Sequence, residues 1–215
     1  LLDAELTLKL PQTITAATGM DALTHAIESY TSKTATPMSQ AMALHAIRMI
    51  GRHLPKAYYA GTDLESRDAM LTASMIAGAA FAQSRLGNVH AISHTLGGVF
   101  NIPHGIANAT LLPFVMQFNR PACPERMSDI AAALGRNVSG LDVEEASELA
   151  VEAVVELNRR LSIPDNIKAL GVNLDMLPKL VEDSMRSGNV WINPRLTSPK
   201  DIETIIRNAY EGILA

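Results

Sequence analysis

The apolar residues of this 215-residue chain recur with a helical period almost throughout, and this pattern restricts the fold more than any other feature. The alternating pattern of β-strands hardly appears. The stretch from Ala69 to Phe81 is apolar on nearly every side, which is typical of a helix buried at the centre of a helical protein. We therefore predict an all-α fold, a compact multi-helix domain of about seven to nine helices that spans residues 1–215.

Residues that favour helix ends mark the limits of these helices. Thr18 is a good N-cap, whereas Gly51 and the pair Gly97-Gly98 are expected to end the helices that precede them. Asp142 and Glu145 have the spacing of a capping box. The expected helices cover residues 18–30, 37–50, 66–83, 89–96, 106–118, a segment from 142, residues 173–185 and a segment from 198.

Composition argues against several classes of partner. The net charge is −4 and the charges are well mixed, so there is no basic stripe for a nucleic acid or an anionic membrane. No apolar run approaches the roughly 18 residues of a membrane span. Cys123 is the only cysteine, which excludes an intrachain disulfide and favours a reducing, cytoplasmic setting. The chain begins without Met or a signal-peptide pattern, so we expect it to be part of a longer protein.

Two motifs carry potential metal chemistry. Asp21 and His25 are four residues apart, a spacing that places a carboxylate and an imidazole on one face of a helix. His90 and His94 have the same spacing, and His104 follows ten residues later in a Pro-His-Gly turn. Three of the six histidines in the chain therefore fall within fifteen residues.

These motifs also have a structural explanation. A lone Asp/His pair on a helix is usually a surface hydrogen bond, but both motifs lie among small and apolar residues. Several buried imidazoles without a shared partner are costly, and an ionised Asp21 near a core needs a counter-charge that a cation supplies. His45 and His53 have no partner motif, so we interpret them as structural or solvated histidines.

A carboxylate and imidazole set without thiolate suits Fe(II), Zn(II), Co(II), Ni(II) or Mn(II) and argues against a cysteine-zinc site. The spacing leaves open which of His90, His94 and His104 are ligands. It also leaves open whether the metal would serve redox chemistry or hydrolysis.

Longer motifs around these residues resemble a known family. The runs 15–28, 87–98 and 101–109 are similar to the segments that supply the metal ligands of iron-containing (group III) alcohol dehydrogenases, and Asn193-Pro-Arg195 continues the similarity. Essentially the whole chain is covered. The resemblance implies the C-terminal domain of that family, an all-helical, dehydroquinate-synthase-like domain that holds one metal, usually Fe(II) and sometimes Zn(II).

The resemblance also implies roles for individual residues. His94 would lie beside the nicotinamide of NAD or NADP and place or relay a proton. Phe81 is similar to a residue that lines the cleft near the nicotinamide and substrate, with a core position as the alternative. The implied metal ligands are Asp21, His25, His90 and His104.

The implied reaction is reversible hydride transfer between NAD(P)(H) and an alcohol/aldehyde pair, with the metal as Lewis acid. Family members also have an N-terminal α/β dinucleotide-binding domain and form oligomers. That domain's glycine-rich loop is absent here, because Gly97-Gly98 is an isolated pair with no preceding strand. We therefore expect the chain alone to fold and bind metal without dehydrogenase activity. The alternatives are a metal-dependent hydrolase or lyase, and a non-catalytic helical domain with a structural metal.

Overall fold

The computed structural model describes residues 1–214, and the regular structure in that range is helical throughout. This confirms the expected all-α class, and the number of α-helices in the described range, nine, agrees with the expected number. Several short 3₁₀ turns connect them. The helices are α1 (Gln12–Thr31), α2 (Pro37–Tyr59), α3 (Leu64–Ser84), α4 (Asn88–Phe100), α5 (His104–Asn119), α6 (Pro124–Ala133), α7 (Val143–Arg160), α8 (Leu177–Met185) and α9 (Pro199–Glu211).

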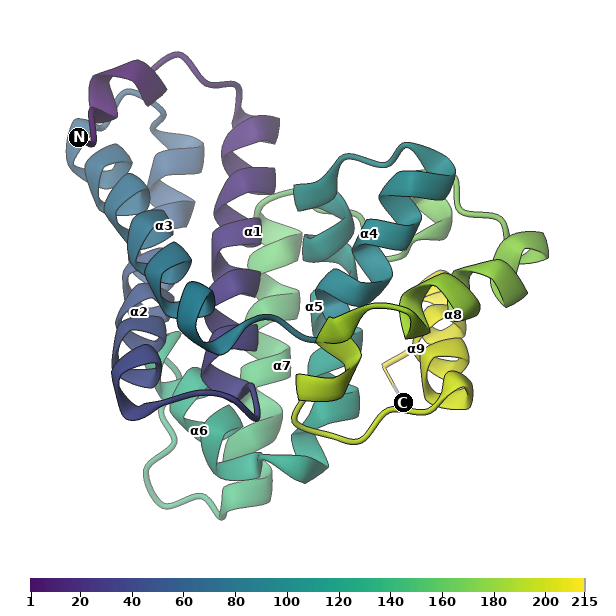
Figure 1. The fold of residues 1–215 in the computed structure, drawn as a ribbon. Helices are drawn as coiled ribbons and strands as arrows, with labels where there is room; N and C mark the ends of the chain where they lie inside the picture. Colours follow the sequence, from purple (N-terminus) through teal and green to yellow (C-terminus); the bar gives the residue numbers. More distant parts are fainter. Residues whose placement is uncertain (215) are drawn as a thin grey trace.

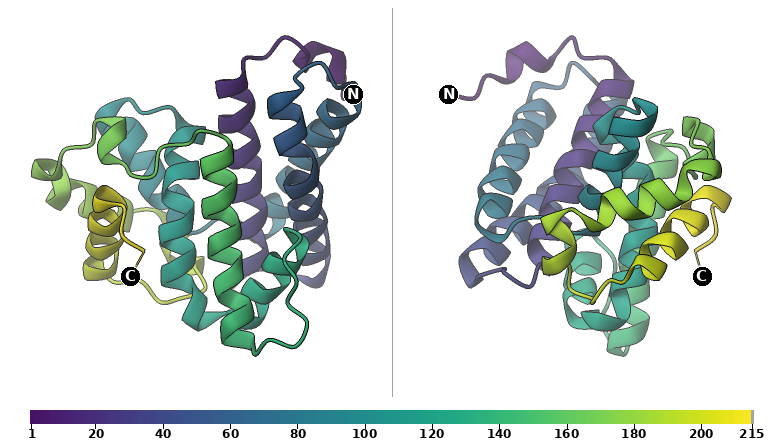
Figure 2. Two further views of the ribbon diagram at one scale, coloured as in Figure 1. Left: turned by 180° about the vertical axis from the view of Figure 1, so that it is seen from behind. Right: turned by 45° about the vertical axis from the view of Figure 1, so that its right-hand side comes forward.

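Helices α1 and α5 form the centre of the arrangement (Figure 1). Helix α1 packs against α2 and α3 on one side and against α5 on the other. Helix α5 in turn contacts α4, α7 and α9. The views in Figure 2 agree that α8 and α9 lie far from α2 and α3, on the opposite side of this central pair.

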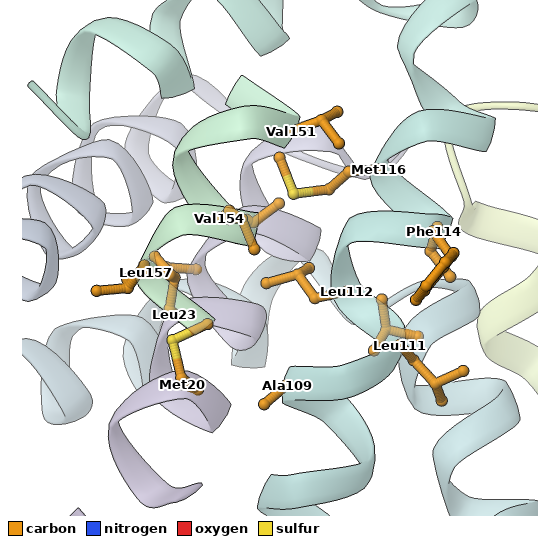
Figure 3. Packing of buried hydrophobic residues seen from close by; sticks show 14 of the residues in the cluster. Met20, Leu23, Ala109, Leu111, Leu112, Phe114, Met116, Val151, Val154 and Leu157 are labelled. Carbon is orange, nitrogen blue, oxygen red and sulfur yellow. The ribbon is translucent and has the colours of Figure 1, made fainter. Parts of the chain in front are cut away.

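The core between α1, α5 and α7 is apolar and closely packed. Figure 3 shows Met20 and Leu23 of α1 near Leu112 of α5, with Val154 and Leu157 of α7 on the adjoining side. All five side chains are buried. Because these side chains interdigitate, the core sets the position of α1 relative to α5.

The first long helix begins earlier than the sequence signals predicted. Thr18 is not its N-cap, because α1 starts at Gln12, directly after Pro11. Proline is favoured at a helix start, where its missing N–H has no helical partner to lose. The Thr18 hydroxyl instead donates to the Ile14 carbonyl, 2.8 Å away within the helix. Asp21 therefore lies in the interior of α1 rather than in its first turn.

Glycine does not end the helices at the two places where it was expected to. Helix α2 continues through Gly51 to Tyr59, and α4 continues through Gly97-Gly98 to Phe100. At Gly51 a β-carbon would lie 3.1 Å from Leu134 Cδ2, so this glycine permits close packing with the end of α6. Helix α4 ends instead at Asn101, whose φ of 56° is left-handed.

The expectation of a central, buried helix at residues 69–81 is also wrong. Helix α3 lies at the edge of the bundle and buries Ala73, Ala77 and Ala80, while Met75 remains 48% exposed. An apolar surface of small side chains does not specify which face packs. The helix buried on all sides is α5, at residues 107–116. None of the helices in the described range is both long and apolar enough to cross a membrane.

Capping signals were more reliable than glycines. Asp142 and Glu145 form the expected capping box at the start of α7, and Ser198 and Asp201 form another at α9. Asn173 caps a 3₁₀ turn that continues into α8. Side-chain caps act locally, which explains why these three were identified from sequence although Thr18 was not a cap.

Helix α6, for which the sequence analysis predicted no helix, follows the only cysteine. Cys123 is buried and free, and burial raises the pKa of its thiol to about 11. Because the thiolate is the reactive form, this cysteine belongs to the core rather than to a reactive site.

A proline inside α5 creates a polar link to α7. Pro113 has no N–H, so the Ala109 carbonyl four residues earlier lacks its helical donor. The Asn158 side-chain amide of α7 donates to this carbonyl over 2.7 Å. Both groups are buried, so the bond satisfies an acceptor that would otherwise be costly to bury.

We expect Asn158→Leu to lower the free energy of unfolding by about 1–3 kcal/mol, because the Ala109 carbonyl loses its donor. In a Pro113→Ala background the helix regains its own N–H, so the same substitution should cost much less. Urea unfolding of the unmodified protein, the two single variants and the double variant measures the coupling energy between Asn158 and Pro113. If Asn158→Leu lowered the free energy of unfolding equally in both backgrounds, the Ala109 carbonyl would not be the cause of the loss.

Candidate metal centre

Four side chains from three helices converge at one place. Asp21 and His25 come from α1, His90 from α4 and His104 from the first residue of α5. Their possible ligand atoms all lie within 4.8 Å of one another. Asp21 Oδ1 is 3.9 Å from Nε2 of His25, 3.9 Å from Nε2 of His90 and 3.6 Å from Nε2 of His104. The structure thus brings together the four residues that the resemblance implied as ligands.

The turn between α4 and α5 places His104 beside His90. Asn101 adopts the left-handed conformation that reverses the chain, and the two imidazole centroids are then 5.2 Å apart. Gly105 allows α5 to begin directly against α1. A β-carbon at Gly105 would lie 2.6 Å from the Ala17 carbonyl oxygen, so a larger residue would push the two helices apart.

His25 is held between two aromatic rings. Its ring stacks on Phe81 at 4.6 Å and on His90 at 4.7 Å between centroids. Burial lowers the pKa of His25 to about 4, and the nearby Asp21 carboxylate opposes this shift only in part. Burial also lowers the pKa of His104. Neutral imidazoles have a free lone pair, which is the form that binds a metal.

His94 lies at the exposed edge of the cluster. Its ring stacks on His104 at 5.2 Å and meets the edge of His90 at 5.7 Å. It is not among the four residues whose ligand atoms converge. Burial lowers the pKa of His94. His45 and His53 lie on α2, outside the cluster.

Asn108, which the sequence analysis did not identify, lies at the centre of the site. Its Nδ2 is 2.6 Å from Asp21 Oδ1, 3.1 Å from His90 Nε2 and 3.0 Å from His104 Nε2. Its Oδ1 is buried without a hydrogen-bond partner. Asn108 follows His104 by four residues on α5, a spacing that could have indicated it.

The surroundings of Asn108 test whether a cation suits this site. One carboxylate oxygen and two imidazole nitrogens point their lone pairs at a single amide group. Such a convergence of acceptors is electron-rich, and a divalent cation satisfies it better than one neutral donor. The residues present therefore fit a metal of the Fe(II) or Zn(II) type.

Glu28 is the second residue that the sequence analysis missed. Its Oε2 is 2.5 Å from His90 Nδ1, the ring nitrogen that faces away from Asp21. A histidine that binds metal through one nitrogen commonly donates the other N–H to a carboxylate. Glu28 lies seven residues after Asp21 and three after His25, on the same face of α1, and this spacing was the available signal.

The site is closed on one side and open on the other. The His90 side chain is 1% exposed, whereas that of His104 is 42% exposed. A small molecule could therefore approach a bound cation from the side where His104 and His94 lie, whereas the side formed by His90 and Glu28 is buried.

We expect Asn108→Leu to lower the unfolding free energy of the metal-free protein by about 1–3 kcal/mol, because the Asp21 carboxylate and the imidazole nitrogens beside it lose the amide that donates among them. Saturating zinc should reduce this loss, since the cation then satisfies the same acceptors. Urea unfolding with and without zinc measures the difference. Asn158→Leu is the control, because it removes a buried amide that bonds the Ala109 carbonyl and none of the proposed ligands. If zinc affected both variants equally, the interpretation of Asn108 would be wrong.

Comparisons with known proteins agree on one family. Residues 15–210 match the family described as Fe-containing alcohol dehydrogenase, C-terminal. The chain is 45% identical to a 1,3-propanediol dehydrogenase of Citrobacter freundii, over 97% of this chain and 54% of that protein. It is 43% identical to an NAD-dependent methanol dehydrogenase of Bacillus methanolicus, over 97% of this chain and 55% of that protein. The chain thus spans about half the length of these curated relatives.

Solved structures give the same result. A crystal structure of a 1,3-propanediol oxidoreductase matches with a TM-score of 0.95 and 44% identity, over 97% of this chain and 55% of that one. An alcohol dehydrogenase from Oenococcus oeni also matches with a TM-score of 0.95, at 38% identity, over 97% of this chain and 54% of that one. Helix order and packing are therefore shared with proteins about twice as long.

Proposed function

This chain belongs to the Fe-containing alcohol dehydrogenase family, and on that premise we propose that it is the metal-binding catalytic part of an NAD(P)-dependent alcohol dehydrogenase. The proposed reaction is reversible hydride transfer between a nicotinamide and a small alcohol or aldehyde. The relatives described above are named as dehydrogenases of a diol and of methanol. Their names favour this reaction over the hydrolase or lyase and structural-metal alternatives.

The proposed metal ligands are Asp21, His25, His90 and His104. The observation that carries this proposal is the convergence of their ligand atoms within 4.8 Å. When bound, a divalent cation of this kind supplies Lewis-acid polarisation of an alcohol or carbonyl oxygen. We propose Fe(II) as the native metal, with Zn(II) as the alternative, because the donor set suits both.

Other residues of the chain have supporting roles in this proposal. The Asn108 amide donates to Asp21 and orients that carboxylate. Phe81 stacks on His25 and excludes water from one side of its ring. His94, at the open edge, is placed to hold or move a proton beside the reacting oxygen, and burial lowers its pKa so that its neutral form prevails near pH 7.

The wider context is proposed from the family. We propose that residues 1–215 form one domain, that a further dinucleotide-binding domain carries most of the NAD or NADP site, since the relatives are about twice as long, and that Phe81 and His94 of this chain lie beside the nicotinamide. We also propose that the protein forms a homo-oligomer. A cytoplasmic setting, expected from the single cysteine, stays a proposal.

We expect the isolated chain to bind about one equivalent of zinc, and His90→Ala to bind at least 10-fold more weakly because the most buried proposed ligand is lost. Calorimetric titration measures the affinity, and thermal melts with and without a chelator report the same site through stability. His45→Ala is the matched control, because His45 is an exposed histidine on α2. Equal binding by both variants, or no binding by the unmodified chain, would refute the proposed centre.

His94→Ala should leave zinc affinity unchanged, because His94 is not a proposed ligand. In a protein that also contains the dinucleotide-binding part, the same substitution should lower kcat by about 100-fold or more and alter its pH profile. Metal analysis and steady-state kinetics separate the two effects. Loss of metal from His94→Ala would show that this histidine is a ligand instead.

A further inference from the structure

Helix α4 begins without a side-chain cap of its own. Its N-cap is Gly87, so no neighbouring side chain accepts from the first free amides. The Asn88 N–H donates to Asn193 Oδ1 over 3.3 Å, and the Val89 N–H donates to Glu28 Oε1 over 2.7 Å. Two segments distant in sequence therefore supply the caps of this helix.

Gly87 is needed for this arrangement because of space. A β-carbon at Gly87 would lie 3.0 Å from Asn193 Oδ1 and 3.0 Å from Glu28 Oε1. Such contacts are tighter than most β-carbon contacts, so an alanine would require one or both capping groups to shift by a few tenths of an ångström. The glycine and the two acceptors thus fit together as a unit.

Glu28 uses its second oxygen on a different group. Oε2 accepts from His90 Nδ1 over 2.5 Å, while Oε1 caps α4. Glu28 is 4% exposed and His90 is 1% exposed, so water does not compete for these bonds. Because a carboxylate oxygen accepts from an imidazole N–H, this contact favours the His90 tautomer that carries its hydrogen on Nδ1.

The opposite nitrogen is then left with a lone pair. His90 Nε2 lies 3.9 Å from Asp21 Oδ1 and 3.1 Å from the Asn108 amide nitrogen, a donor that a lone pair on Nε2 can accept. Helix α1 carries Asp21, His25 and Glu28 on one face. One helix thus supplies two proposed ligands directly and sets the orientation of a third.

We propose that Glu28 is the positioning residue of this centre. One of its oxygens caps α4 and the other fixes the tautomer of His90. The position of α4 beside α1 and the affinity for metal therefore depend on the same carboxylate. This inference rests on the proposed function, because it concerns the proposed ligand His90. It adds a residue that does not itself contact the metal.

Glu28→Gln tests this role with little change in shape. A glutamine has one accepting oxygen and one donating amide, so it can satisfy the Val89 N–H or the His90 Nδ1–H, but not both. If the oxygen caps α4, the amide faces Nδ1 and moves the imidazole hydrogen to Nε2. We therefore expect zinc affinity to fall by about 10–100-fold.

Two measurements read out the effect. Zinc affinity is measured by competition with a chromophoric chelator. The His90 tautomer is measured by ¹⁵N side-chain spectra of the metal-free protein at about pH 8.5, roughly two units above the usual imidazole pKa. The unmodified chain should carry the His90 hydrogen on Nδ1, and Glu28→Gln should shift it toward Nε2. Glu145→Gln is the matched control, because that carboxylate caps α7 without a histidine partner, and it should change neither readout.

The inference is overturned if the unmodified protein carries the hydrogen on Nε2, or if Glu28→Gln keeps both the zinc affinity and the tautomer. Should Glu28→Gln fail to fold, the ¹⁵N spectrum of the unmodified protein still shows which nitrogen of His90 carries the hydrogen. Gly87→Ala is then a second variant, which should weaken zinc binding without altering a ligand. Failure of the unmodified chain to bind zinc would refute the proposed function alone, because the tautomer is measured without metal.

Discussion

Two carboxylates on the inner face of α1, Asp21 and Glu28, impose the constraint around which the rest of the site is arranged. A carboxylate withdrawn from water needs hydrogen bonds or a counter-charge. Helix α4 satisfies Glu28 with His90 and a backbone amide, and α5 brings Asn108 to Asp21. The same packing of α4 and α5 beside α1 brings the imidazole nitrogens together around one point. The contacts that satisfy the buried carboxylates therefore also create a site that can hold a cation.

The geometry also separates the two sides of the site. His90 and Glu28 lie where α1 and α4 exclude water, whereas His104 and His94 lie where α5 begins and remain accessible. A rigid, closed side suits the orientation of ligands, and an open side suits the exchange of a small molecule. On the closed side, the Asn88 N–H at the start of α4 also donates to Asn193 in the segment before α9. This segment therefore contributes to the position of α4.

The sequence predicted what depends on local spacing and failed where packing decides. The pairs Asp21/His25 and Asp142/Glu145 act within one or two helical turns, so their patterns were sufficient. Gly51 did not end α2, because its role is to admit Leu134 from a distant helix. Glu28 and Asn108 were missed for a related reason: each acquires its function only through helices that meet it in space.

The bond between Asn158 and the Ala109 carbonyl has a consequence for motion. Because Pro113 leaves α5 one hydrogen bond short, α5 is fully satisfied only while α7 is docked against it. Partial opening of this region should therefore release the two helices together, as one cooperative unit in amide exchange. The hydrogen-bonded amides of α5, from Ala107 onward, should then exchange together with those of α7, although His104 at the start of the helix is exposed to solvent.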